Sequence, residues 1–363
     1  MRLGVEAALV DGALVPGDVE IADGAVAGYG LASPNGSGVA VPGFVDLQVN
    51  GFAGVDLMTA DHEGYRRAGE ALLESGVTAY LPTFISAPEE DLLAALGNVP
   101  VDDRGARILG VHLEGPFISE RRLGIHPPAA RRDPDPALLE RLLGAGPVRL
   151  MTLAPELSGA DELIDRLLLG GIAVSCGHTD ATAEEAAHAF DRGARAVTHI
   201  FNAMRPFRHR DPGLAGAALA REDVIVQIIL DGVHLAEETA RVVWQAAPGR
   251  VALVTDAIAA AGMRDGFYFL GGLEIEMRDG VARSLDEILA GSALTMIEAV
   301  RNLHGFGIPL TQAVAAATTV PARVLGTPDL GRLDVGLPAD LLVLDDNLEI
   351  ERVCVGGEDR VVA

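Results

Sequence analysis

The sequence predicts an α/β protein: a (β/α)8 barrel of the TIM type with a small β-sandwich domain formed by the N- and C-terminal segments. Eight Val/Ile/Leu-rich runs, separated by Ala/Leu/Glu-rich stretches, predict the barrel. Short apolar runs between tight-turn dipeptides at both ends predict the sandwich. At 363 residues, of which 49% are hydrophobic, the chain suits one barrel plus one small domain better than three independent domains.

The expected elements follow a simple order along the chain. Residues 1–41 alternate short apolar runs with Asp-Gly and Pro-Gly turns, and residues 328–363 show the same pattern of short apolar runs and turns. We therefore expect the two ends to pair as one small domain. The barrel is expected over residues 42–327. Its eight strands are expected at Val41–Val49, Val77–Phe84, Ile108–Leu113, Val148–Ala154, Ile172–Cys176, Ala196–Ile200, Val224–Leu230 and Val251–Thr255.

Ala/Leu/Glu-rich stretches between most of these strands predict the covering helices. They include residues 62–76, 135–146, 161–171, 182–193 and 236–249. Several end in Gly, which is favoured just past a helix C-terminus. The strands show little polar alternation, as expected of parallel strands that helices cover.

Composition excludes several classes of function. The net charge of −24 and the pI of about 4.6 argue against nucleic acid or an anionic membrane as a partner, because both would be repelled. No secretory leader pattern is present and no run reaches the roughly 18–20 apolar residues of a membrane helix, so a cytoplasmic location is expected. Two cysteines, Cys176 and Cys354, give no disulfide framework. All 28 basic residues are Arg, which excludes Schiff-base lysine chemistry and a lysine that bridges two metals.

Four of the apolar runs end in a residue suited to metal binding or proton transfer. Glu114 ends ILGVHLE, His178 follows IAVSCG, His199 follows AVT, and Asp256 follows VALVT. Each alone would more often be structural, as a cap or an ion-pair partner. A barrel gathers the C-terminal ends of its strands on one face, so the four residues can meet around one ion.

One Glu and two His form a common zinc-hydrolase ligand set that leaves a coordination position for water. We therefore predict one divalent ion, with Zn²⁺ as the first choice and Fe²⁺, Co²⁺ or Mn²⁺ as alternatives. An ionised Asp256 beside the ion can accept the water proton and pass it to a leaving amine.

Longer motifs carry a resemblance to a known family. They are PGFVDLQVNG (42–51), HLEGPF (112–117), GHTDAT (177–182), THIFNAM (198–204), DPGLAG (211–216), DGVH (231–234), LVTDA (253–257), LAGSALTM (289–296) and PADLLVLD (338–345). With these motifs the chain resembles the N-acetylglucosamine-6-phosphate deacetylases, a family of the amidohydrolase superfamily. The resemblance implies hydrolysis of the N-acetyl group to give glucosamine 6-phosphate and acetate.

The resemblance also implies roles for individual residues. It makes Glu114, His178 and His199 the metal ligands, Asp256 the general base and acid, and His126 the group that polarises the acetyl carbonyl. The implied substrate contacts are Ile125, His126, Asn202, Ala203, Arg210, His234, Leu289, Ala290 and Gly291. Among these, Arg210 and His234 would hold the phosphate, and a homodimer is expected in which the neighbouring subunit can lend the Arg.

The end of the first strand departs from the superfamily pattern. Many amidohydrolases carry His-x-His there for a second metal, whereas this chain has Gln48 and Asn50. Amides are poor ligands for zinc-like ions and the bridging lysine is absent, so a single metal is expected, with Gln48 close to its bound water. Two alternatives stay open: a deacetylase for N-acetylgalactosamine 6-phosphate, and a catalytically silent barrel that binds sugar phosphates.

Overall fold

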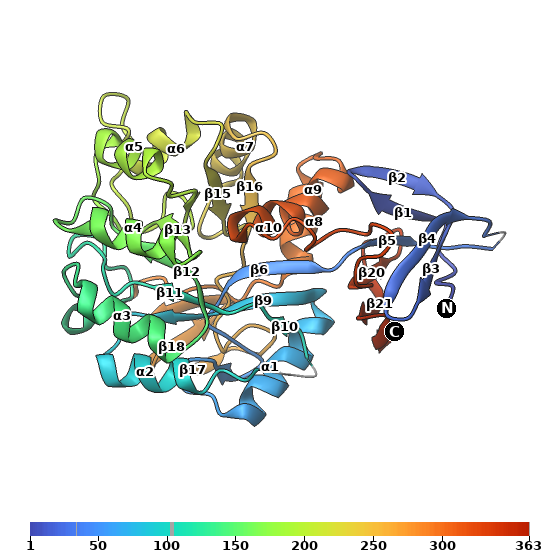
Figure 1. The fold of residues 1–363 in the computed structure, drawn as a ribbon, viewed down its shortest axis with the longest axis horizontal. Helices are drawn as coiled ribbons and strands as arrows, with labels where there is room; N and C mark the ends of the chain where they lie inside the picture. The colour runs from blue at the N-terminus through green and yellow to red at the C-terminus, as the bar shows by residue number, and fades with distance from the viewer. Residues whose placement is uncertain (34, 102–104, 363) are drawn as a thin grey trace.

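Eight parallel strands form a barrel in the computed structural model, which describes residues 1–33, 35–101 and 105–362 (Figure 1). Each strand pairs with the next around the ring. A parallel bridge between Val49 and Ala257 closes the ring between the first and last strands. The strands are β6 (Phe44–Val49), β9 (Val77–Ile85), β11 (Val111–Glu114), β12 (Val148–Leu153), β13 (Ala173–Cys176), β14 (Ala196–Val197), β15 (Ile225–Ile228) and β16 (Val251–Leu253). A two-residue strand, β10 (Arg107–Ile108), precedes β11 on the same edge of β9.

The expected covering helices are all present. Three of them begin at a side-chain cap: Asp61 accepts from the Gly64 N–H, Asp135 from the Ala137 N–H, and Thr182 forms a capping box with Glu185. The helices are α1 (His62–Glu74), α2 (Glu89–Gly97), α3 (Pro136–Ala145), α4 (Ala160–Leu169), α5 (Ala183–Asp191), α6 (Gly213–Leu219), α7 (Glu237–Ala246), α8 (Met296–Gly305), α9 (Leu310–Ala316) and α10 (Thr319–Leu325), with a 3₁₀ turn, η1 (Pro128–Ala130). No described helix is both long and apolar enough to span a bilayer.

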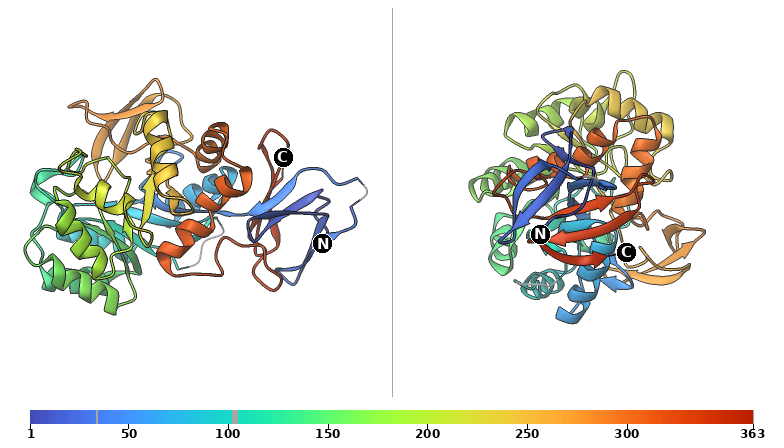
Figure 2. Two further views of the ribbon diagram at one scale, coloured as in Figure 1. Left: turned by 90° about the horizontal axis from the view of Figure 1, so that it is seen from above. Right: turned by 90° about the vertical axis from the view of Figure 1, so that its right-hand side faces the viewer.

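The two ends of the chain form one sheet, as Figure 2 shows at one end of the long axis. Its members are β1 (Ala7–Val10), β2 (Ala13–Pro16), β5 (Val39–Pro42), β20 (Leu341–Leu344), β21 (Ile350–Val355) and β22 (Glu358–Val362), beside a hairpin of β3 (Asp18–Ala22) and β4 (Ala25–Leu31). These strands bury an apolar cluster separate from the barrel core. The division into two domains, one of residues 1–41 and 328–363 and one of residues 42–327, stays a proposal. Residues 34, 102–104 and 363 of these ranges lie outside the described residues.

The first expected barrel strand has a different boundary in the structure. Val41 and Pro42 belong to β5 of the terminal sheet, and only residues from Phe44 onward belong to the barrel. Gly43 separates the two strands, and a Cβ at this position would lie 2.1 Å from Thr78 Oγ1. The close approach of the Thr78 side chain therefore requires glycine where the chain passes from one sheet to the other.

Two small β elements were not expected from the sequence. An antiparallel sheet of β17 (Gly266–Leu270), β18 (Leu273–Arg278) and β19 (Val281–Ser284) follows the last barrel strand (Figure 2). A short hairpin of β7 (Gly51–Phe52) and β8 (Val55–Asp56) follows the first. Both lie at the C-terminal ends of barrel strands, where they extend the rim of the barrel.

Candidate metal centre and substrate pocket

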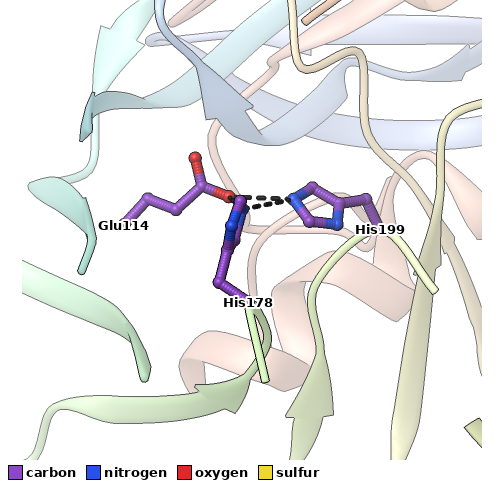
Figure 3. A group of neighbouring side chains, drawn as sticks. All are labelled: Glu114, His178 and His199. Atoms are coloured by element: carbon purple, nitrogen blue, oxygen red, sulfur yellow. Dashed lines mark hydrogen bonds and ion pairs between the residues drawn. The ribbon is translucent and has the colours of Figure 1, made fainter. Parts of the chain in front are cut away.

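Three side chains converge at the C-terminal ends of β11, β13 and β14. The Glu114 Oε1 atom lies 3.2 Å from His178 Nε2 and 3.0 Å from His199 Nε2, and the two Nε2 atoms are 3.2 Å apart (Figure 3). All three residues are buried. Among the described residues this is the one group of three His, Cys, Asp or Glu side chains whose ligand atoms could hold a metal ion.

The donor set fits a divalent cation. The His178 Nδ1 atom lies 3.0 Å from the Arg122 carbonyl oxygen, which can only accept, so Nδ1 carries the ring proton and the Nε2 lone pair points into the cluster. Burial opposes ionisation of Glu114, but the adjacent His178 and the close contacts with three histidines hold the pKa of Glu114 well below its usual range. One carboxylate oxygen and imidazole nitrogens directed at a common point match the ligands of zinc-like ions.

The backbone at these strand ends is strained. His178, His199 and Asp256 have φ values of 48°, 28° and 50°, in the left-handed region that side chains other than glycine rarely adopt. Such conformations persist only where the surrounding structure enforces them, and they concentrate at functional sites. Here they occur directly after buried parallel strands, at the residues for which a ligand or acid–base role is expected.

Asp256 lies beside the cluster, held by two amides. Its Oδ1 atom accepts from Gln48 Nε2 at 3.0 Å and from Asn50 Nδ2 at 2.7 Å, and Gln48 Nε2 also donates to Glu114 Oε1 at 3.0 Å. Burial, together with the charge of Glu114, raises the pKa of Asp256 to about 6. A carboxyl group with a pKa near neutrality is suited to taking and returning a proton at neutral pH. The two amides contact carboxylates through their nitrogens.

His126 approaches the cluster from the loop after β11. The Ser86 N–H donates to His126 Nδ1 at 3.1 Å, which makes Nδ1 an acceptor and leaves the proton on Nε2. The Nε2 atom has no hydrogen-bond partner and lies 3.6 Å from Glu114 Oε2. Burial lowers the pKa of His126 to about 4, so the ring is neutral at neutral pH. The structure therefore directs an uncharged N–H donor at the metal cluster.

A cavity of about 340 Å³ opens over these groups. His234 Nδ1 lies 2.7 Å from Asp231 Oδ2, which fixes the ring so that the opposite edge is left for a ligand. Of the expected site residues, those that line the cavity are Asn50, Glu114, Ile125, His126, His178, His199, Asn202, Ala203, His234, Asp256, Leu289 and Gly291.

Three expected residues do not line this cavity. Gln48 lies behind Asp256 and Glu114, and Ala290 is fully buried between two lining residues. Arg210 is exposed on the loop between β14 and α6. In the structure it is not brought to the cavity of its own chain.

Part of the cavity wall is formed by residues that were not predicted from the sequence. These residues are Ile85, Gly124, Ile229, Leu270, Arg283, Glu287 and Ile288. Leu270 and Arg283 belong to the unexpected sheet of β17–β19, and Glu287 and Ile288 follow it. The turn dipeptides Gly271-Gly272 and Asp279-Gly280 are the signal that could have revealed the two hairpins of that sheet.

The chain is similar over most of its length to proteins of known family. Residues 39–360 match the amidohydrolase family. An N-acetylglucosamine-6-phosphate deacetylase of Bos taurus is 38% identical over 342 residues, which cover 89% of this chain and 83% of that protein. An N-acetylgalactosamine-6-phosphate deacetylase of Escherichia coli O157:H7 is 35% identical over 325 residues, covering 87% of this chain and 86% of that protein.

One similar solved structure contains a substrate. It is a variant of the N-acetyl-D-glucosamine-6-phosphate deacetylase of Mycobacterium smegmatis in complex with N-acetyl-D-glucosamine 6-phosphate. Its chain superposes with a TM-score of 0.95 at 39% identity, covering 100% of this chain and 99% of that one.

Proposed function

The chain belongs to the amidohydrolase family, and from this membership we propose that it hydrolyses the N-acetyl group of N-acetylglucosamine 6-phosphate, giving glucosamine 6-phosphate and acetate. The observation that carries this proposal is the convergence of Glu114, His178 and His199 beside Asp256 in one cavity. The Mycobacterium smegmatis relative in complex with N-acetyl-D-glucosamine 6-phosphate supports the same substrate.

Each group in the cavity has a part in the reaction. Glu114, His178 and His199 would hold a divalent ion, Zn²⁺ before Fe²⁺, Co²⁺ or Mn²⁺, which would supply the Lewis acidity to acidify water and polarise the acetyl carbonyl. Asp256 takes the proton of the attacking water and returns it to the amine that leaves. His126 donates its Nε2 proton in a hydrogen bond to the carbonyl oxygen as negative charge develops there.

A single metal ion per chain is part of the proposal. Gln48 and Asn50 replace the histidines of a second site, and their amide nitrogens are already engaged with Asp256 and Glu114. Elemental analysis of metal-loaded protein is expected to give about one ion per chain, because amides are poor ligands for zinc-like ions. Two tightly held ions would contradict this prediction.

The substrate contacts divide between the sugar and the phosphate. Ile125, Asn202, Ala203 and the segment Leu289–Gly291 are proposed to hold the sugar and acetyl group. His234 and Arg210 are proposed to hold the phosphate. Because Arg210 lies outside the cavity of its own chain, we propose that it enters the cavity of a second subunit in a homodimer. The proposed location is the cytoplasm.

Acetate release is the direct test. Metal-loaded protein is expected to release acetate from N-acetylglucosamine 6-phosphate. The same assay with N-acetylgalactosamine 6-phosphate decides between the two sugar epimers, since the Escherichia coli relative that carries the galactosamine name is about as similar as the others. Binding of the sugar phosphate without release of acetate would identify a silent barrel instead.

A further inference from the structure

Asp180 joins three loops around the metal cluster. It lies two residues after His178, and its side chain is only 11% exposed. The Oδ1 atom accepts from Arg122 Nε at 2.8 Å and Nη2 at 2.6 Å. The Oδ2 atom accepts from Arg121 Nη1 at 3.2 Å and lies 3.5 Å from Arg205 Nη1. One carboxylate thus links the loop after β13 to the loops after β11 and β14.

The contact with Arg122 leads directly to a metal ligand. The Arg122 carbonyl accepts from His178 Nδ1 at 3.0 Å and so fixes the rotation of that ring. His199 has no such support, because its Nδ1 atom has no partner among the described residues. The orientation of His178 therefore depends on where the Arg122 backbone lies, and the Arg122 side chain is anchored on Asp180. His126 follows four residues later in the same loop.

Asp180 is itself held in place. Its N–H donates to Glu156 Oε1 at 2.7 Å, and the hydroxyl of Thr179 donates to the other oxygen of Glu156. The Asp180 carbonyl accepts from Arg205 Nη1 at 3.2 Å, and Arg205 Nε in turn donates to Asp211 Oδ1 at 2.8 Å. The carboxylate is thus a fixed anchor to which the arginines are bound.

We propose that Asp180 is a positioning residue for the metal site: through Arg122 it orients His178, and with the same loop it places His126. Asp180 does not line the substrate cavity, so its effect is indirect. Without the carboxylate, Arg122 would lose the ion pair that anchors its side chain, and the loop after β11 would move. Loss of an outer partner of a metal-ligating histidine typically weakens metal affinity or activity about 10- to 100-fold.

The decisive measurement is the metal affinity of Asp180→Asn. Metal-depleted protein is titrated with Zn²⁺ against a competing chelator, and about 10- to 100-fold weaker binding is expected. Asp223→Asn is the matched control, because Asp223 forms a two-point pair with Arg221 at 2.8 Å and 2.8 Å outside the cavity. The control is expected to bind Zn²⁺ as the wild type does. Equal affinity in Asp180→Asn and wild type, or equal weakening in the control, would overturn the proposal.

A second variant separates positioning from loss of fold. Arg122→Gln keeps the backbone carbonyl that contacts His178 but removes the side-chain anchor. Arg122→Gln is expected to weaken Zn²⁺ binding as Asp180→Asn does. The double variant is expected to lose no more Zn²⁺ affinity than the weaker-binding single variant. Additive losses would show that the two residues act separately and would contradict the proposal.

The kinetic part of the test rests on the proposed deacetylase activity. At saturating Zn²⁺, kcat of Asp180→Asn is expected to stay below that of wild type because His126 is displaced. If wild-type protein releases no acetate, the proposed function fails, whereas the Zn²⁺ titrations still decide the role of Asp180.

Discussion

Asp256 combines three features that would each be unfavourable at an ordinary position. It is a carboxylate only 8% exposed, it has a left-handed backbone conformation, and it lies near the negative charge of Glu114. The amides of Gln48 and Asn50 offset part of this cost, because both donate to its Oδ1 atom. The amides that stand where many amidohydrolases have histidines thus have a physical role: they hold Asp256, the proposed proton-transfer group, in place.

Asp256→Asn tests the proton-transfer role. The asparagine has the same shape and keeps an oxygen that can accept from Gln48 and Asn50, but it can neither take a proton from water nor return one to the amine. Turnover is expected to fall by about 10²- to 10⁴-fold while metal content stays near that of wild type. Acetate release and elemental analysis on the same preparation check both parts. Near-normal turnover would mean that another group is the base.

Asp46 predicts a pH dependence of stability. It is completely buried below Asp256, and its carboxylate accepts from the Thr255 hydroxyl at 2.6 Å and the Gln48 N–H at 3.2 Å. Burial raises the pKa of Asp46 to about 7. An unfolded Asp has a pKa of about 3.9, so between pH 4 and pH 7 the folded state binds a proton that the unfolded state does not. The contribution of Asp46 to the free energy of unfolding therefore decreases as the pH rises from about 4 to about 7.

Asp46→Asn removes this titration. One pKa unit corresponds to about 1.4 kcal/mol, so the wild type is expected to lose up to roughly 4 kcal/mol relative to Asp46→Asn between pH 4 and pH 7. Urea unfolding of both metal-depleted proteins at several pH values measures this difference. Parallel curves for the two proteins would show that Asp46 does not titrate in this range.

At the scale of elements, the barrel strands could be predicted because buried parallel strands leave an uninterrupted apolar run. The same property hides which sheet a run belongs to. Nothing in the run Val41–Val49 marks the passage from β5 to β6 except the dipeptide Pro42-Gly43, and the need for glycine there arises from the approach of Thr78. The proposed ligands Glu114, His178 and His199 could be predicted because each follows an apolar run that ends a barrel strand, and such a position can be recognised in the sequence.

The wall formed by β17–β19 could not be predicted in the same way. Residues of β17 alternate between exposed and partly buried positions, and Phe267 and Phe269 are 63% and 53% exposed. Such short, half-exposed strands give a weak sequence signal. Leu270 and Arg283 of this sheet line the cavity, and Arg283 forms a β-bridge with Leu289, another lining residue; these contacts depend on the folded arrangement. Arg283 therefore appears as a cavity residue only in the structure.

Arg283 is expected to contribute to substrate binding. It lines the cavity, whereas Arg278, which shares the Glu287 carboxylate at 3.1 Å, does not. Arg283→Gln is expected to lower kcat/KM for the sugar phosphate by about 2- to 12-fold, the range of one net hydrogen bond. Arg278→Gln, which changes the same ion-pair cluster, is expected to leave kcat/KM unchanged. Equal effects in the two variants would assign Arg283 a structural role only.

At the scale of the whole molecule, the charge poses a problem for an anionic substrate. The chain carries a net charge of −24, so a phosphate is repelled at long range and must be held by a few local cations. Among the described residues, Arg283 is the arginine that lines the cavity of its own chain. The lining histidines outside the group of Glu114, His178 and His199 are His126 and His234. Arg210 stands exposed on a rim loop, where a second subunit could receive it. If Arg210 acts as proposed, the phosphate site is complete only in a dimer.

Arg210→Ala alone is expected to lower kcat/KM for the phosphorylated substrate by about 10- to 150-fold, the range of one charge-assisted contact. Its kcat/KM for unphosphorylated N-acetylglucosamine is expected to change far less. If both substrates declined by the same factor, Arg210 would be a structural residue. A mixed dimer of one Arg210→Ala chain and one Asp256→Asn chain also decides which chain supplies the arginine to each site.

In a mixed dimer with Arg210 acting between subunits, the site built on the Arg210→Ala chain keeps its own Asp256 and receives an intact arginine from the other chain. The second site carries both defects. After complete exchange of equal amounts, about half of the dimers are mixed, and activity is expected to recover to about a quarter of wild type. Each variant taken alone through the same exchange is the control. Activity equal to the mean of the two separate variants would contradict an arginine that acts between subunits. An arginine acting within its own chain leaves every site in the mixture with one defect.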